Sequence, residues 1–323
     1  MTYLGNHTKN NKFISFFNLK NLKAKTYFNN SCFSSTKNFS TFTNNQLGYY
    51  LAGLIEGDGS IILRKGEKES TSPKIVFTFS KNEIPMYEKL KEIINSGVIY
   101  IEKSGVCRYS ITNSEAVINI INIINGKFRT PKISALHNAI DNLNKWRNCN
   151  LLKLPLDTSN LDSNAWLAGF IDTDGHFSIK LTGSYGSDDL ETRGRVQCVF
   201  TLSQSELHRT TGESNVPIMT ELANFFQVNL NYKTHNNKSF KNPAKSLVFF
   251  AQSDRKHYII TSYLSKFPLM SSKHLNYLSF FKGLGYLGKR LTREEILEIR
   301  NIKNSMNNQR NEFNWDHLKI FYS

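Results

Sequence analysis

Residues 50–59 read YLAGLIEGDG, and the same pattern returns at residues 166–175 as WLAGFIDTDG. Each copy joins a Leu-Ala-Gly run to a large apolar pair and ends in an Asp-Gly step, with another acid two positions earlier. One such decapeptide could arise by chance, but two copies in matching surroundings indicate an internal repeat. The chain therefore contains two copies of one structural unit.

The repeated pattern predicts a helix suited to close packing. Leu51, Leu54 and Ile55 fall on one face of that helix, and Ala52 and Gly53 leave almost no side chain beside them. A glycine inside a helix costs about 1 kcal/mol relative to alanine, so a glycine in both copies calls for a compensating gain. Close contact between two helices provides it. We expect the two pattern helices to form the interface between the units.

The last acid of each copy is Asp58 or Asp174, and each precedes a glycine that suits a helix C-terminal cap. The negative end of a helix opposes a carboxylate there by roughly 0.3 to 1 kcal/mol. Packed helices would also bring the two like charges together, and a cation would stabilise that arrangement. Carboxylate oxygens are hard ligands that suit Mg²⁺. We therefore expect Asp58 and Asp174 to bind a divalent metal, the alternative being that both simply point into solvent.

Segments of alternating polarity follow each pattern and predict half-buried strands. In the first unit they are residues 60–64, 74–80, 98–102 and 106–112, and in the second residues 176–182, 195–203, 228–234 and 246–252. Helical stretches at residues 85–95 and 216–227 separate the strand pairs, and another helical stretch closes each unit. Ser163 or Asn164 is the expected N-cap of the second pattern helix, and Thr292 that of an added helix at residues 293–304. The predicted fold class is α+β, with two pseudo-symmetric αββαββα units that each contain an antiparallel four-stranded sheet.

Strand parity predicts a core face and a polar, cationic face on each sheet. Ile61 and Leu63 point inward in the first unit, as do Phe177, Ile179 and Leu181 in the second. The outward side chains are of the types that contact base edges and phosphates, and a two-stranded ribbon fits the major groove. An ordinary solvated face is the alternative. The expected DNA-binding residues are Ser60, Ile62, Arg64, Lys74, Thr78, Ser80, Arg108 and Ser110 in the first unit and His176, Ser178, Lys180, Thr182, Arg195, Gln197, Val199, Thr201 and Ser203 in the second, with Val76 on the same outward face.

Charge and composition narrow the classes of protein. The chain has 323 residues, and 41 Lys and Arg against 26 Asp and Glu give a net charge of +15, which favours a polyanionic partner. A hydrophobic content of 39% excludes a wholly disordered chain. No apolar run approaches the roughly 18 residues of a spanning helix, so no membrane partner is expected. The 4 cysteines lie far apart without a C-x-x-C pair, which signals neither a zinc site nor a disulfide scaffold.

The first 45 residues form a basic extension with six lysines and no acid. This composition resembles a transit peptide but contains no arginine. The alternative is a low-complexity extension, because the whole chain is rich in Asn, Lys, Ile, Phe and Tyr, the residues of AT-rich codons typical of an organelle genome. Both interpretations predict a mitochondrial location. The expected domains are this extension at 1–45, a first unit at 46–150 and a second unit with a C-terminal helix at 151–323.

The two patterns resemble the signature helices of the LAGLIDADG homing endonucleases, in their two-repeat, single-chain form. The resemblance extends to residues 125–133 (NGKFRTPKI) and 266–275 (KFPLMSSKHL), and covers the chain from about residue 46 to about residue 310. It implies two DNA-binding sheets over a long asymmetric target, with the signature helices at the centre. A calcium loop is excluded, because with Asp172 as first ligand the required final glutamate would fall on Gly183.

The family's metal-binding catalytic acid corresponds to Asp58 and Asp174. By matching context the resemblance also implies catalytic or phosphate-binding roles for Lys81 and Gln204, after the second strand of each unit, and for Lys132 and Lys273. Glu56 and Asp172 occupy the other acidic position of the pattern, where we expect a structural role. The implied reaction is Mg²⁺-assisted hydrolysis of double-stranded DNA that leaves short 3′ overhangs.

Two other functions stay open at this point. The chain could be an RNA maturase that assists splicing of its host group I intron, with the intron RNA as partner. A DNA-binding regulator with a decayed site is less expected, because both acids are present. An intein is not expected, since the sequence starts at Met1 and ends at Ser323 without splicing nucleophiles. The fused repeats supply their own pseudo-dimer, so we expect a monomer.

Overall fold

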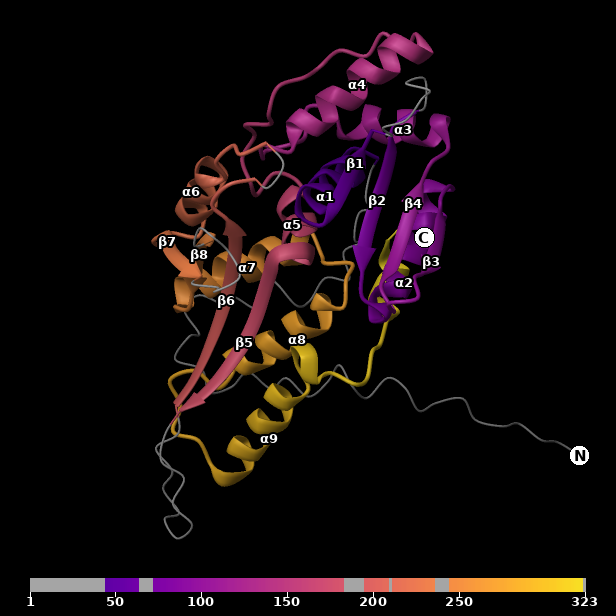
Figure 1. Cartoon of the computed structure of the whole chain (residues 1–323). Coiled ribbons are helices and arrows are strands. Elements are labelled where there is room, and N and C mark those ends of the chain that lie inside the picture. The colour runs from indigo at the N-terminus through magenta and orange to yellow at the C-terminus, as the bar shows by residue number, and fades with distance from the viewer. Residues whose placement is uncertain (1–43, 64–71, 183–194, 209–210, 236–243, 322–323) are drawn as a thin grey trace, which may run out of the picture. The chain divides into compact units, whose positions relative to one another are not determined.

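The computed structural model describes residues 44–63, 72–182, 195–208, 211–235 and 244–321. These residues belong to one compact unit, in which the same order of helices and strands occurs twice (Figure 1). The predicted α+β fold, with two pseudo-symmetric repeats that each contain a four-stranded antiparallel sheet, is therefore confirmed. None of the described helices is long and apolar enough to cross a membrane.

Both repeats begin with a pattern helix that leads directly into a strand. The first repeat contains α1 (Asn44–Gly57), β1 (Gly59–Ile62), β2 (Lys74–Phe79), the 3-10 helix η3 (Lys81–Glu83), α2 (Ile84–Ile94), β3 (Val98–Ile101), β4 (Cys107–Ile111), α3 (Ser114–Ile124) and α4 (Ile133–Arg147). The second contains α5 (Trp166–Asp174), β5 (Gly175–Thr182), β6 (Arg195–Ser205), α6 (Val216–Phe225), β7 (Asn231–His235), β8 (Ala244–Ala251), α7 (Asp254–Lys266) and α8 (Lys273–Leu284). The chain continues through α9 (Arg293–Asn304), η4 (Asn307–Gln309) and η5 (Asp316–Ile320).

Each repeat closes with two helices where the sequence analysis expected one helical stretch. Proline is the physical reason, because Pro131 lies between α3 and α4 and Pro268 between α7 and α8. A proline lacks the N–H that a continuous helix needs and clashes with the preceding turn. Gly126, with φ +76, also turns the chain directly after α3. The two connections bring backbone N–H groups to the ends of the pattern helices.

The sheets have the same topology, with strand orders β1-β2-β4-β3 and β5-β6-β8-β7 and antiparallel pairing throughout. Their core faces carry aromatic residues that pack against helices. Phe77 lies 5.6 Å from Tyr87 of α2 between ring centroids, and Phe177 lies 5.3 Å from Phe280 of α8. Ile61 and Ile179 face the core as predicted, but Leu63 lies beyond the end of β1 and is 37% exposed. Its predicted inward orientation is wrong because β1 ends at Ile62.

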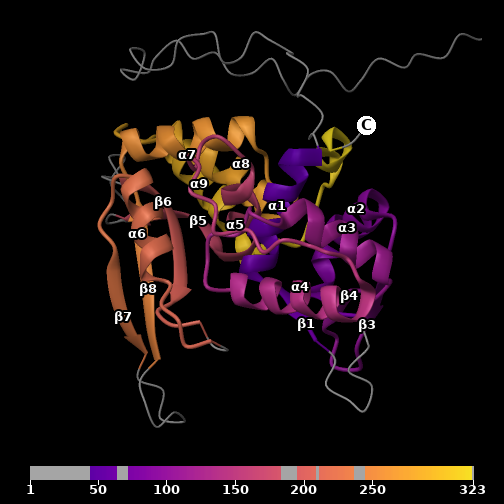
Figure 2. The same ribbon diagram turned by 90° about the horizontal axis from the view of Figure 1, so that it is seen from above.

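The pattern helices α1 and α5 lie side by side between the two sheets (Figure 2). A Cβ added to Gly53 would overlap the carbonyl oxygen of Trp166, and one added to Gly169 would overlap that of Tyr50. The two backbones thus touch at glycine positions related by the repeat. Close helix contact, which the sequence analysis inferred from the helical glycines, is confirmed.

The predicted starts of α2, α6 and α9 agree with the structure to within one residue, whereas α1 starts at Asn44, six residues before the repeated decapeptide. Thr292 caps α9 through a capping box with Glu295, as expected. The N-cap of α5 is Ala165, but the neighbouring Asn164 Oδ1 accepts from Trp166 N at 3.0 Å. The Asn164 side chain therefore satisfies a backbone N–H at the start of this helix.

Candidate active site

Asp58 directly follows α1, and Asp174 is the last residue of α5. Asp58 N donates to Leu54 O at 3.1 Å, which keeps this residue on the final turn. Burial raises the pKa of both carboxyl groups, to about 6 for Asp174, and the negative charge of Asp58 raises the pKa of Asp174 further. The two acids therefore lie close enough for one charge to act on the other.

Lys132 and Lys273 donate to the backbone carbonyls around the two acids. The acceptors are Ile55 (2.9 Å), Gly57 (3.2 Å) and Gly59 (3.0 Å) for Lys132, and Ile171 (3.3 Å) and Thr173 for Lys273. A cation at this end of a helix satisfies carbonyls without helical partners and offsets the helix dipole. Their positive charges also lower the pKa values of Asp58 and Asp174. The two lysines thus fix the turns that carry the acids.

The residues beside the two acids differ. Gln204 Nε2 donates to Asp174 Oδ2 at 2.7 Å, and the Thr173 hydroxyl lies 3.1 Å from the same oxygen. The counterpart of Thr173 in the first repeat is Gly57. The strand register places Phe79, not Lys81, at the position of Gln204, because Gly59 pairs with Phe77 whereas the equivalent Gly175 pairs with Leu202. Lys81 is exposed, and within the described residues neither it nor the Asp58 carboxylate makes a side-chain hydrogen bond. The Asp58 side chain reaches the surface, although the atoms packed around it partly desolvate its carboxyl group, whereas Asp174 is half-buried and held by Gln204.

Glu56 and Asp172 are buried and accept several hydrogen bonds. Glu56 accepts from Arg129 N (2.8 Å), Thr130 N (2.5 Å) and Trp166 Nε1 (2.5 Å). Asp172 accepts from Tyr50 Oη (2.6 Å), Met270 N (2.8 Å), Ser271 N (3.3 Å) and Ser271 Oγ. Each acid binds the connection before the last helix of its own repeat and the aromatic residue that begins the opposite copy of the decapeptide, Trp166 or Tyr50. These contacts support the structural role expected for both.

The predicted DNA-binding residues share one face of each sheet. Strand register pairs Ser60 with Val76 and Val76 with Ser110 in the first sheet, and His176 with Thr201 in the second. All the described candidates are exposed or half-buried, apart from Val199, which is only 2% exposed. The predicted exposure is wrong for Val199 and for Val76, because these small side chains on central strands are covered by their neighbours. Arg64 lies outside the described residues.

The same register adds side chains that the sequence analysis missed. Tyr100 of β3 pairs with Arg108 and is 44% exposed, and Lys233 of β7 pairs with Ser246. Lys233 Nζ lies 5.0 Å from the centroid of the Phe250 ring. Parity along β3, β4, β7 and β8 would have identified them, since residues paired directly across an antiparallel sheet share a face.

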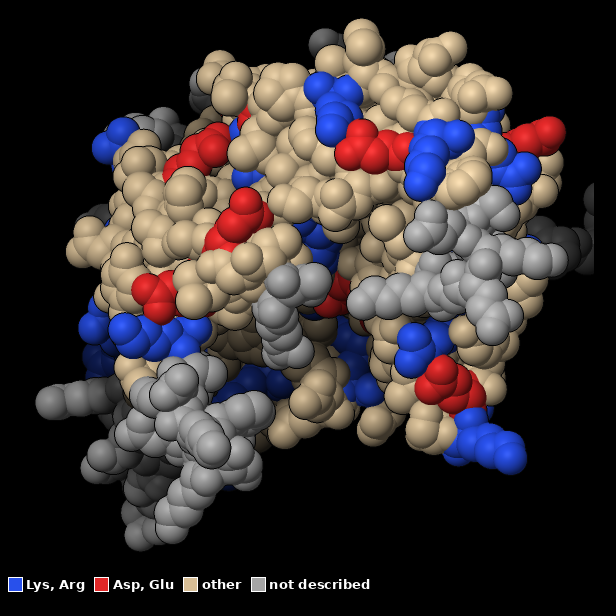
Figure 3. Space-filling model, turned by 45° about the horizontal axis from the view of Figure 1, so that its top comes forward, with Lys and Arg blue, Asp and Glu red and all other residues tan. Residues whose placement is uncertain are grey.

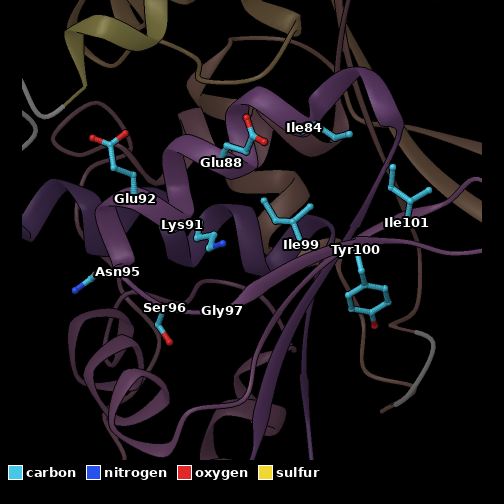
Figure 4. A pocket seen from close by; sticks show the side chains of 10 residues that line it. All are labelled: Ile84, Glu88, Lys91, Glu92, Asn95, Ser96, Gly97, Ile99, Tyr100 and Ile101. Carbon is cyan, nitrogen blue, oxygen red and sulfur yellow. The ribbon is translucent and has the colours of Figure 1, made fainter.

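Lys and Arg side chains line a hollow between two lobes of the molecule (Figure 3). Acidic atoms are also visible within it. A separate pocket lies between α2 and β3, where Glu88, Lys91 and Tyr100 are among the lining residues (Figure 4). None of the expected catalytic residues lines that pocket, so it is distinct from the acidic pair.

The acidic pair suits a divalent cation of the kind that the fold implies. Two carboxylates provide hard oxygen ligands, and their mutual repulsion and partial burial would both be relieved by a bound cation. The described residues contain no group of three or more His, Cys, Asp or Glu placed to hold a metal. Asp58 and Asp174 are therefore the residues that would hold the ion, together with ligands from outside the protein.

Comparison with known proteins gives consistent results. The sequence model of the LAGLIDADG endonuclease family matches residues 51–142 and 167–284. The intron-encoded DNA endonuclease aI3 of Saccharomyces cerevisiae is 31% identical over 309 residues, which cover 86% of this chain and 73% of that protein. The intron-encoded RNA maturase bI4 of the same yeast is 24% identical over 284 residues, covering 85% of this chain and 41% of that protein. The crystal structure of the I-LtrWI LAGLIDADG homing endonuclease bound to target DNA has a TM-score of 0.56 with 19% identity, covering 83% of this chain and 100% of that one.

Proposed function

The chain belongs to the LAGLIDADG endonuclease family, and we propose from this premise that it cuts both strands of a long, asymmetric DNA target at one site. The observation that carries the proposal is the pair of acids, Asp58 and Asp174, at the ends of two packed helices between two polar sheet faces. One acid per repeat suits one cleavage per strand. The +15 net charge supports binding to the phosphate backbone.

Asp58 and Asp174 would hold Mg²⁺ at the scissile phosphates. A divalent metal there supplies Lewis-acid chemistry, since it stabilises charge gathering on the phosphate and eases the loss of a proton from water. Lys132 and Lys273 keep the two acids in place through the carbonyls that they bind. Gln204 orients one oxygen of Asp174. Lys81 is free to reach toward the phosphate or the attacking water.

The outward sheet faces would bind the duplex on both sides of the cleavage centre. We assign this role to Ser60, Ile62, Lys74, Thr78, Ser80, Arg108 and Ser110 in the first sheet and His176, Ser178, Lys180, Thr182, Arg195, Gln197, Thr201 and Ser203 in the second. Val199 is excluded from this set because it is buried. The protein would act as a monomer in the mitochondrion, encoded by an intron, and would leave short 3′ overhangs. The mitochondrial assignment is supported by the high content of Asn, Lys, Ile, Phe and Tyr, which are the residues of AT-rich codons.

The test is cleavage of intron-lacking organelle DNA from the source organism with Mg²⁺, followed by sequencing of the ends. We expect one discrete double-strand break with short 3′ overhangs, absent when EDTA replaces Mg²⁺. Asp58→Asn should abolish it, whereas Asp141→Asn, which changes an exposed ion pair with Lys153, should leave it intact. Persistent cleavage by Asp58→Asn would remove the proposed role of the acid.

The maturase function remains the second candidate, because the similar bI4 protein is an RNA maturase by name. Acceleration of splicing of the host intron transcript by the purified protein would support it. A protein that binds this RNA tightly but cuts no DNA would replace our first proposal.

A further inference from the structure

The second repeat contains an ordered hairpin that the first repeat lacks. After Lys81, the first repeat runs through η3 directly into α2. In the second repeat, residues 205–215 lie between Gln204 and the start of α6 at Val216. We call the described residues 205–208 and 211–215 of this stretch the insert hairpin.

Backbone hydrogen bonds order this segment on both of its arms. His208 N donates to Glu213 O at 2.8 Å, and Asn215 N donates to Glu206 O at 2.8 Å. Leu207 and Ser214 form an antiparallel bridge between them. Glu206 N also donates to Lys245 O of β8 at 3.0 Å, which joins the hairpin to the second sheet. The arms are therefore a continuation of the sheet.

The insert hairpin reaches from one catalytic acid to the surroundings of the other. It begins directly after Gln204, which donates to Asp174. At its other arm, Glu213 Oε2 accepts from Ser134 Oγ at 3.3 Å, and Ser134 lies two residues after Lys132 at the start of α4. Both ribbon views place the segment between β6 and α6 beside this end of α4 (Figures 1 and 2). The hairpin thus connects the second sheet with the first repeat beside the acidic pair.

His208 has a defined hydrogen-bonding state in this hairpin. Its Nδ1 lies 3.0 Å from Thr211 Oγ1 and accepts from Thr211 N at 3.4 Å. Burial and the positive charge of Lys132 lower the pKa of His208, which favours the neutral ring. A neutral imidazole that accepts at Nδ1 carries its proton at Nε2. The ring therefore offers an Nε2–H donor, and the neighbouring Leu207 is 53% exposed.

We propose that the insert hairpin is a DNA-binding element over the centre of the target, in which His208 Nε2–H donates to a backbone phosphate oxygen beside the half-site of Lys132. Phosphate contacts from neutral donors position a duplex without reading its sequence. The hairpin occurs in one repeat only, so it contacts one side of the target centre. This inference rests on the proposed endonuclease function.

The test compares two isosteric substitutions of His208 on the duplex that the wild-type protein cuts, with binding measured in the absence of Mg²⁺. His208→Asn keeps an oxygen near the Nδ1 position but has no donor at the reach of Nε2, whereas the longer amide of His208→Gln can donate there. We expect His208→Asn to raise the Kd about tenfold, as for loss of one hydrogen bond to a charged group, and His208→Gln to restore most of the affinity. The slope of log K against log salt should not change, because no cation is removed.

Phosphate-ethylation interference locates the contact. The wild-type protein and His208→Gln should show interference at one phosphate near the cleavage centre that His208→Asn no longer shows. The matched control is His137→Ala, on α4, whose Nε2 bonds the carbonyl of Leu154; it should keep the wild-type pattern. Unchanged thermal unfolding of His208→Asn verifies that the hairpin variant is folded.

Cleavage by the wild-type protein distinguishes failure of the proposed endonuclease function from failure of the hairpin proposal. If the wild-type protein cuts no DNA, the proposed function fails before His208 is tested. If the wild-type protein cuts its target and His208→Asn binds it with unchanged Kd and interference pattern, the hairpin proposal is overturned while the endonuclease function stands.

Discussion

The two ends of the pattern-helix pair differ more than the helices do. Gly53 and Gly169 make the same backbone contact, and Glu56 and Asp172 accept from equivalent N–H groups. Beyond the helix ends, Asp174 is held by Gln204, whereas Asp58 is exposed. The repeats have therefore kept the packing that the fold requires and diverged where a bound target would differ on its two sides.

Equal destabilisation by Gly53→Ala and Gly169→Ala would sharpen the symmetric part of this comparison. Each new Cβ would overlap a carbonyl oxygen of the opposite helix, which cannot move without separating α1 from α5. We expect each substitution to lower the free energy of unfolding by about 3 kcal/mol in urea denaturation. Gly57→Ala is the contrast, because its Cβ would meet only the Thr173 side chain, and Thr173→Gly in the same protein should reverse most of its loss. A large loss from only one of the two central glycines would contradict the symmetry.

Replacement of the buried acids by amides should also act on both repeats. Glu56→Gln and Asp172→Asn turn an amide NH₂ toward groups that are themselves donors, which leaves buried polar atoms unpaired. We expect each to lower the free energy of unfolding by about 2 kcal/mol. The exposed Asp141→Asn should change it by less than about 0.5 kcal/mol. If either amide variant were as stable as the wild type, its acid would not hold the connection as described.

The different surroundings of Asp58 and Asp174 predict that the two DNA strands respond differently to substitutions beside these acids. Gln204→Ala removes the hydrogen bond that fixes Asp174, and we expect one strand to be cut roughly tenfold more slowly, as for loss of about 1.4 kcal/mol. Lys81→Ala removes no hydrogen bond among the described residues and should slow cleavage less. Single-turnover assays with each strand end-labelled in turn measure both effects. Equal slowing of both strands by Gln204→Ala would contradict the assignment of this residue to one half-site.

Acidification should weaken Mg²⁺ binding through Asp174. Its pKa is raised to about 6, so below about pH 6 the carboxyl is protonated and cannot act as an anionic ligand. The Mg²⁺ concentration for half-maximal cleavage should therefore rise as the pH falls through 6. The stability of the metal-free protein should change with pH in the other direction. The raised pKa means that the folded state favours the protonated carboxyl of Asp174, so the contribution of this group to the free energy of unfolding is lost as the pH rises through about 6. A half-maximal concentration that stays constant from pH 7 to pH 5 would contradict this role.

Much of the fold was predictable from the sequence because it depends on local patterns. The repeated decapeptide, the alternating strands and the helical glycines predicted both sheets and the packed helices, and the acids at the helix ends followed from the same pattern. The second closing helix was missed, although Pro131 and Pro268 signal a break.

The details of the site depended on contacts between distant segments. Val199 pairs with Ser178 of β5 and is only 2% exposed, and this burial depends on surrounding side chains that parity alone does not reveal. The bond from Gln204 to Asp174 and the carbonyl contacts of Lys132 and Lys273 depend on side-chain conformations that no sequence pattern fixes. Gly212 is the main turn signal in the sequence of the insert hairpin. The packing of this hairpin against α4 depends on the whole fold.

The most direct test of the central claim is plasmid cleavage by Asp58→Asn and Asp174→Asn, with nicked and linear products scored separately. We predict that the wild-type protein converts a supercoiled plasmid carrying the target to the linear form and that neither variant does so, while both remain folded and bind the target. Linear product at the wild-type rate from either variant would show that cleavage does not depend on the pair of acids, and would contradict the account.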